Sequence, residues 1–119
     1  MTTVSEKTSQ GRLDDGGNSV LVAGPITIDL ERHEARLDGN EVHFSHRELL
    51  LLAFLIQKGG KVVSSDEISQ EVWGKATNTN TIQVHIKRIR QKLGDDSQHG
   101  DIIRTVRGVG YRLSPPLCP

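Results

Sequence analysis

The stretch from Asn78 to Leu93, NTNTIQVHIKRIRQKL, restricts the possible folds of this chain more than any other. On a helix that turns by about 100° per residue, its apolar residues fall into one narrow stripe. The stripe consists of Ile82, Ile86, Ile89 and Leu93. The opposite side carries Asn80, Thr81, Val84, Lys87, Arg88 and Gln91, and the stretch contains no carboxylate. One face can therefore be buried in a core while the other stays cationic.

A cationic face that also bears amides matches the groove of a nucleic acid. Lysine and arginine bind phosphates, while arginine, asparagine and glutamine can make two-pronged contacts with base edges. From this segment alone, a solvated helix surface is the slightly better interpretation, because Lys and Arg are mostly exposed in proteins. The rest of the chain has to decide between the two.

The charge of the chain is unevenly distributed. The formal net charge of the 119 residues is zero, which by itself argues against a nucleic-acid binder. However, residues 1–78 hold 8 Lys or Arg against 12 Asp or Glu, whereas residues 79–119 hold 7 against 3. Electrostatic steering depends on the local field, so a basic end favours a docking surface for an anion.

Length and composition exclude several classes of protein. The chain is long enough for one small domain. Its single cysteine, Cys118, allows neither a disulfide within the chain nor a metal site built from thiolates. The longest apolar run, Leu49 to Ile56, is far shorter than the roughly 20 residues of a membrane span. No signal peptide is visible, so we expect a cytoplasmic protein without membrane association. The sequence also leads us to expect no metal and no cofactor.

The first part of the chain changes character at Val20. Residues 1–19 are polar and are expected to form a disordered tail or linker. Short runs follow at 20–22, 26–30, 34–37 and 41–44, which predict strands. Asp38-Gly39 between the last two favours a tight hairpin turn. We therefore expect a small antiparallel sheet of three or four strands.

Two capping boxes predict the next two helices. Ser45-x-x-Glu48 stands directly before an apolar run that forms the main core helix, which Gly59-Gly60 ends. Ser64-x-x-Glu67 opens a short helix from Ser65 to Trp73. Gly74 is the expected stop of the second helix, and a tight link then leads into the basic helix, with Gly94 as its C-cap.

The end of the domain is predicted to be a β-hairpin. Residues 102–106 and 111–113 read as strands around the turn Arg107-Gly108-Val109-Gly110. Such a ribbon with a guanidinium at its tip can reach into a minor groove. Residues 115–119, beginning with two prolines, are a short C-terminal tail.

The order of these elements is sheet, helix, helix, basic helix, hairpin. It predicts an α+β domain over residues 20–114: a winged helix-turn-helix with an N-terminal antiparallel sheet, three helices and a C-terminal hairpin as the wing. In this architecture the basic helix enters the major groove of duplex DNA.

Three strings of the chain are close to those of a known family: EVWG at 71–74, TIQVHIKRIRQKLG at 81–94 and IRTVRGVGYR at 103–112. A weaker match lies at 44–49. On these residues the chain from Val20 to Leu113 resembles the winged-helix effector domain of OmpR/PhoB-type response regulators. The resemblance implies sequence-specific binding of double-stranded DNA by a bacterial transcription regulator of a two-component system. The recognition helix would lie in the major groove and the wing in the minor groove.

The resemblance also implies roles for single residues. Arg88 corresponds to the main base reader, Val84 to an apolar contact with a thymine methyl, and Arg107 to the minor-groove probe. The implied contacts with the DNA backbone are Trp73, Asn80, Thr81, His85, Lys87, Arg90, Thr105 and Tyr111. Alternatives stay open for three of these: Trp73 as a core or lid residue, His85 as a packed imidazole, and Arg90 paired with a carboxylate inside the domain.

Members of this family usually bind direct repeats as two copies, head to tail, so we expect a monomer off DNA and a pair on it. RNA polymerase is a further candidate partner, through the link that precedes the recognition helix. That link is shorter here than in other members, which counts against activation by this route. The chain also lacks the receiver domain that normally precedes the effector, so it is either a fragment or a free-standing regulator.

Two other classes of function compete with DNA binding. One is a winged-helix module that has lost DNA binding and binds a protein instead, which the zero net charge and the shortened link favour. The other is an enzyme, which finds no support, because no Ser/His/Asp grouping, phosphate-binding loop or spacing of metal ligands is present in the sequence.

Overall fold

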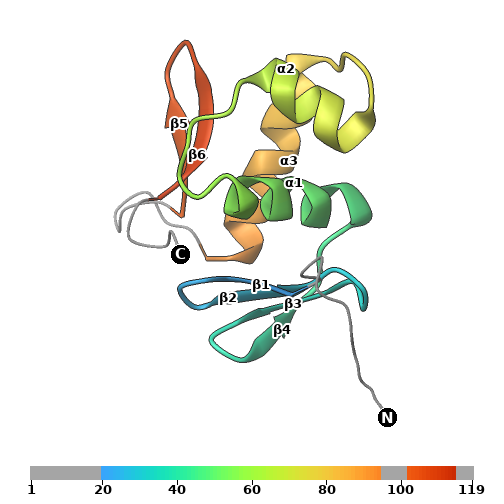
Figure 1. Ribbon diagram of the computed structural model, residues 1–119, viewed down its shortest axis with the longest axis vertical. Helices are drawn as coiled ribbons and strands as arrows, with labels where there is room; N and C mark the ends of the chain where they lie inside the picture. Colours follow the sequence, from blue (N-terminus) through green and yellow to red (C-terminus); the bar gives the residue numbers. More distant parts are fainter. Residues whose placement is uncertain (1–19, 95–101, 115–119) are drawn as a thin grey trace.

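The computed structural model of this chain describes residues 20–94 and 102–114. The two predicted tails, including Cys118, lie outside the described residues. Within the described part, a four-stranded sheet is followed by helices and a two-stranded hairpin, so the predicted α+β class and order of elements are confirmed. Figure 1 shows the sheet below helix α1, helix α2 and the hairpin above it, and helix α3 crossing behind it.

The N-terminal sheet is an antiparallel meander in which each strand pairs with the next. Its strands are β1 (Val20–Ala23), β2 (Ile26–Asp29), β3 (Glu34–Leu37) and β4 (Asn40–Val42). Asp38 and Gly39 both have positive φ, 53° and 83°, as the predicted tight turn requires. The last strand ends before the predicted end at Phe44, because the chain there leads into the extended cap of the next helix.

Helix α1 (His46–Gln57) is the central core helix. The predicted capping box is present: Ser45 Oγ accepts from the Glu48 N–H, and the Glu48 carboxylate accepts from the Ser45 N–H. The helix is buried along most of its length, and its fully buried leucines join the sheet to the helices behind it. Gly59 with φ 61° follows its end, as predicted.

The second predicted helix forms in two parts. Helix α2 (Ser65–Ile68) begins at the predicted capping box of Ser64 and continues as η1 (Ser69–Trp73), a segment wound as a π-helix. The chain stops at Gly74 in the left-handed conformation with φ 74°. The wider winding of η1 is a difference from the prediction of one regular helix.

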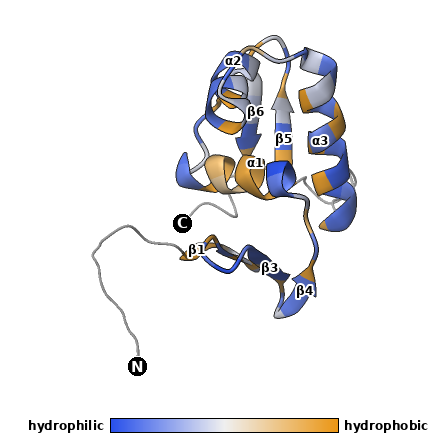
Figure 2. Cartoon of the chain, turned by 90° about the vertical axis from the view of Figure 1, so that its right-hand side faces the viewer, coloured by the Kyte–Doolittle hydropathy of each residue, from blue (hydrophilic) through white to orange (hydrophobic). Residues whose placement is uncertain are grey.

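Helix α3 (Thr79–Lys92) is the predicted basic helix. Asn78 caps it by accepting from the Asn80 N–H at 2.7 Å. The predicted stripe of Ile82, Ile86, Ile89 and Leu93 is buried, and Figure 2 shows the hydrophobic and hydrophilic bands along this helix. No helix among the described residues is long and apolar enough to cross a membrane.

The hairpin of β5 (Ile103–Val106) and β6 (Gly110–Leu113) forms the wing. It is tied to the segment before α2, because Val63 and Tyr111 exchange two backbone hydrogen bonds of 2.8 and 2.9 Å. Val63 and the wing thus form a short three-stranded patch. The wing is therefore fixed along β6 to the segment that opens the helix-turn-helix.

Candidate nucleic-acid interface

The outward face of α3 carries the side chains that the sequence analysis singled out. Asn80, Val84, Lys87, Arg88 and Gln91 are exposed. Val84 is 44% exposed although it is apolar. Exposure of an apolar side chain among cations is what a contact with a thymine methyl needs.

Arg88 and Lys87 are available to a ligand. Both side chains are exposed, and within residues 20–94 and 102–114 neither makes a hydrogen bond or an ion pair. Helix α3 contains no carboxylate that could pair with either of them. Their charges are therefore not neutralised by α3 itself.

Arg90 ties α3 to the wing. Its Nε and Nη2 donate to the carbonyl of Ile103 at 3.1 and 2.8 Å, and Nη2 also donates to Thr105 Oγ1 at 2.9 Å. The guanidinium thus finds a carbonyl and a hydroxyl on β5 as its partners. Figure 2 shows β5 beside α3. This contact places two of the predicted backbone-contacting residues, Arg90 and Thr105, against each other.

Trp73 and His85 lie in contact at the start of α3. Their rings meet edge to face with centroids 5.1 Å apart, and both residues are half-buried. His85 Nδ1 is 2.8 Å from the carbonyl of Thr81, so this nitrogen carries the proton and donates it. The two side chains therefore pack against each other while each remains half-buried.

Arg47 is a contributor that the sequence analysis missed. Its Nη1 donates to the carbonyl of Val72 at 3.0 Å, and its guanidinium lies 5.6 Å from the centroid of the Trp73 ring. A cation over an indole face is attracted by the ring quadrupole. Arg47 thereby connects α1 to the end of η1. No local pattern distinguishes it from a solvated helix residue.

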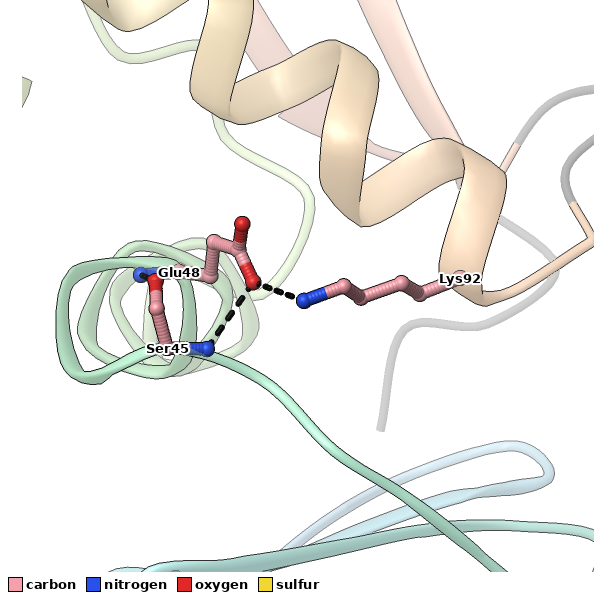
Figure 3. A network of polar contacts seen from close by, with 3 residues as sticks. All are labelled: Ser45, Glu48 and Lys92. Carbon is pink, nitrogen blue, oxygen red and sulfur yellow. Dashed lines mark hydrogen bonds and ion pairs between the residues drawn. The ribbon is translucent and has the colours of Figure 1, made fainter.

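Glu48 and Lys92 join the start of α1 to the end of α3, which was also not foreseen. Lys92 Nζ lies 2.6 Å from Glu48 Oε1 and 5.7 Å from the centroid of the Phe44 ring. Figure 3 shows the carboxylate of Glu48 accepting from both the Ser45 backbone and Lys92. Glu48 is 2% exposed, so this is a buried carboxylate with a half-exposed cation.

The net pKa of Glu48 is lowered from its ordinary value. Burial by itself raises the pKa, but the hydrogen bond from Lys92, the Ser45 N–H and the charges of Lys92 and His85 together outweigh it. A carboxyl with a lowered folded-state pKa stabilises the fold above its unfolded-state pKa of about 4.3 and loses that contribution as the pH falls through the folded-state pKa.

We therefore expect Glu48→Gln to remove part of the acid sensitivity of the fold. Glutamine keeps the capping box but cannot ionise. The free energy of unfolding of the variant should be lower than that of the wild type at neutral pH, and the difference should shrink as the pH falls below about 4.3. Urea unfolding at a series of pH values measures this. A difference independent of pH would show that the charge of Glu48 does not stabilise the fold.

A hollow of about 360 Å³ lies between the start of α2, the first turns of α3 and the wing. Its lining includes Ser65, Asp66, Thr79, Gln83, Thr105 and Tyr111. Tyr111, predicted to contact the DNA backbone, is only 6% exposed and packs in the core. Most of this ring is therefore structural, and its contribution to a surface is confined to the wall of the hollow.

The wing tip presents Arg107. The residue is exposed, and Gly108 beside it has φ 77°, so the turn projects the tip beyond the paired strands. Of the predicted contact residues, Asn80, Val84, Lys87, Arg88, Thr105 and Arg107 are exposed, and Trp73, Thr81, His85 and Arg90 are half-buried. The structure thus brings a cationic helix face and an arginine-tipped hairpin together through the contact of Arg90 with β5.

Comparison with known protein families gives a match to the model described as "Transcriptional regulatory protein, C terminal" over residues 39–113. The sensory transduction protein RegX3 of Mycolicibacterium smegmatis is 36% identical over 104 residues, covering 84% of this chain and 46% of RegX3. The response regulator protein PmrA of Pseudomonas aeruginosa is 37% identical over 98 residues, covering 81% of this chain and 42% of PmrA. The chain thus spans about half the length of the curated relatives it matches.

Solved structures show the same fold. The DNA-binding domain of RstA from Klebsiella pneumoniae, in complex with the RstA box, matches with a TM-score of 0.75 and 27% identity, covering 82% of this chain and 99% of that one. The DNA-binding domain of CpxR from E. coli matches with a TM-score of 0.72 and 34% identity, covering 81% and 96%. The predicted winged helix-turn-helix architecture is confirmed, and so is the resemblance to OmpR/PhoB-type effector domains.

Proposed function

This chain belongs to the family of C-terminal domains of transcriptional regulatory proteins, and we propose that it binds double-stranded DNA in a sequence-specific manner as part of a bacterial response regulator. Helix α3 would lie in the major groove and the wing in the adjacent minor groove. The observation that carries the proposal is the exposed face of α3, which has no carboxylate and is held beside an arginine-tipped wing.

The relatives support this proposal. RstA is described with its DNA box bound, and the AdeR DNA-binding domain with an intercistronic region. Both share the fold of this chain at more than 25% identity. The polar, carboxylate-free face of α3 supplies the chemistry that duplex binding needs, which an interaction module without DNA binding would not require.

We propose that base edges are contacted by Arg88 and Val84 in the major groove and by Arg107 in the minor groove. The proposed contacts with the DNA backbone are Trp73, Asn80, Thr81, His85, Lys87, Arg90, Thr105 and Tyr111. The half-buried members of this set would act partly by position: Arg90 sets the wing beside α3, and the Trp73–His85 contact sets the start of α3.

The finer features of the assembly are also proposals. Two copies would bind direct repeats head to tail, with a monomer off DNA and a cytoplasmic location. RNA polymerase would be reached through the link between η1 and α3, the exposed residues 74–76 and Asn78 with half-buried Thr77. The shortness of this link argues against that last contact.

Selection of bound duplexes from a random pool, followed by titration at several salt concentrations, tests the function. We expect one enriched motif and an affinity that falls steeply with salt, with a slope of about 0.9 for each phosphate neutralised. A scrambled duplex of equal length serves as the control. No enrichment, together with binding that ignores salt, would favour the protein-interaction module instead.

A further inference from the structure

Two arginines face each other on the wing. Arg104 of β5 is the cross-strand partner of Arg112 of β6. Tyr111 uses its own N–H and C=O to bond Val63, so it makes no backbone hydrogen bond with β5. The backbone hydrogen bonds between β5 and β6 therefore fall on the residues before and after Tyr111. Arg104 and Arg112 are one of these hydrogen-bonded pairs. The Cβ atoms of directly opposed residues lie about 5 Å apart, so the two arginine side chains start side by side on the same face of the hairpin.

The pair lies on the face of the wing turned away from the core. Side chains alternate between the two faces of a strand, and Tyr111 and Leu113 are buried on the other face. The side of the wing that carries Tyr111 and Leu113 also carries Thr105, which is exposed and accepts a hydrogen bond from Arg90. The arginine pair is therefore on the opposite side of the wing from α3.

Folding alone disfavours this arrangement. Like charges directly opposite each other on a sheet repel. Within the part of the chain that the structure describes, neither guanidinium has a hydrogen-bond or ion-pair partner, and Nε of Arg112 is buried without an acceptor. A buried donor without a partner is unfavourable unless a ligand satisfies it. The pair therefore has the character of a site for an anion.

We propose that Arg104 and Arg112 together bind a backbone phosphate on the far side of the minor groove that the wing tip enters. This inference rests on the proposed DNA binding. The minor groove is about 6 Å wide, so a hairpin inserted by its tip has a phosphate strand on each of its faces. The face with Thr105 and Arg90 looks toward the strand next to α3, and the arginine pair looks toward the other. Two guanidinium forks match the oxygens of a phosphate.

A phosphate scan tests the proposal. The probe is a single-site duplex of the selected sequence, in which neutral methylphosphonates replace the phosphates one at a time. The protein variants are Arg104→Gln with Arg112→Gln, and Arg32→Gln as a matched control, since Arg32 is an exposed arginine of the N-terminal sheet. We expect the double variant to bind the unmodified duplex about tenfold more weakly, with a salt slope reduced by about 0.9 for the phosphate lost.

The decisive readout is the coupling between protein and DNA. One or two neutralised positions should weaken the wild type and the Arg32 variant but leave the double variant unaffected. If every neutralisation weakens all three proteins alike, Arg104 and Arg112 contact no phosphate and the inference fails. If the double variant is weak only on duplexes with two sites, the pair contacts a second copy instead, which also overturns it.

Two further measurements separate a phosphate contact from a structural role of the pair and from a failure of DNA binding itself. Thermal unfolding of the double variant should occur at the same or a higher temperature, because a repulsion is removed; a lower temperature would indicate a structural role and would contradict the proposal. Arg88→Ala, measured on the same duplexes, reports on the proposed function. Suppose that Arg88→Ala loses base preference while the double variant binds as the wild type does. DNA binding would then stand, and only the proposed phosphate contact of Arg104 and Arg112 would be rejected.

Discussion

Replacing Arg88 by alanine should weaken binding to the specific duplex by about 1–3 kcal/mol and relax the base preference at one position. The side chain is exposed on the outward face of α3 and has no partner among the described residues, so its removal leaves the fold unchanged. Arginine makes its bidentate contact only with a guanine at the right position, so the substitution removes that contact only from duplexes that contain this guanine. The loss on a scrambled duplex should therefore be smaller.

The neighbouring Lys87 is the matched control for Arg88. It is also exposed and carries the same charge, but a lysine that contacts a phosphate does not distinguish one base from another. Lys87→Ala should weaken specific and scrambled duplexes alike and reduce the salt slope by about 1. Titration of both variants on both duplexes, at several salt concentrations, measures the two effects. Equal losses on the two duplexes for Arg88→Ala would remove Arg88 as a base reader.

Replacing Gly110 by alanine should have the largest effect on the fold of the wing. A Cβ at this position would lie 1.9 Å from the Val63 carbonyl oxygen, 2.7 Å from its carbon and 2.9 Å from Ser64 Cα. All three atoms belong to the backbone, so no side chain can turn aside. We expect a destabilisation of about 3 kcal/mol, at the upper end of the range for overpacking, together with weaker DNA binding as the wing separates from Val63.

Gly108 provides the control for this prediction. It lies in the same turn with φ 77°, but a Cβ there would meet nothing within 4 Å. Gly108→Ala should therefore cost only the strain of the left-handed conformation, about 1–2 kcal/mol. Urea unfolding compares the two variants, and amide exchange of Tyr111 and Val63 reports on the contact between the wing and the neighbouring segment. If Gly110→Ala destabilises the fold less than Gly108→Ala, or leaves the amide exchange of Tyr111 and Val63 unchanged, the close approach of Gly110 to Val63 does not determine the stability of the wing.

Much of the fold was predictable because its determinants are local. Each of Ser45 and Ser64 finds its capping partner three residues further on, Glu48 and Glu67. The turn at Asp38-Gly39 needs only two residues that tolerate positive φ. The isoleucine stripe of α3 follows from helical periodicity and required no knowledge of what covers it.

The sequence by itself thus determined the order of the elements, the buried side of α3 and the exposed cationic side. Only the tertiary structure decided which charged groups have partners within the domain. Arg90 bonds β5, Arg47 contacts Val72 and Trp73, and Lys92 pairs with Glu48, 44 residues away. Periodicity assigns a residue to a face of its own helix, but the partner on that face comes from another element. Its identity depends on how the elements pack, which no local pattern contains.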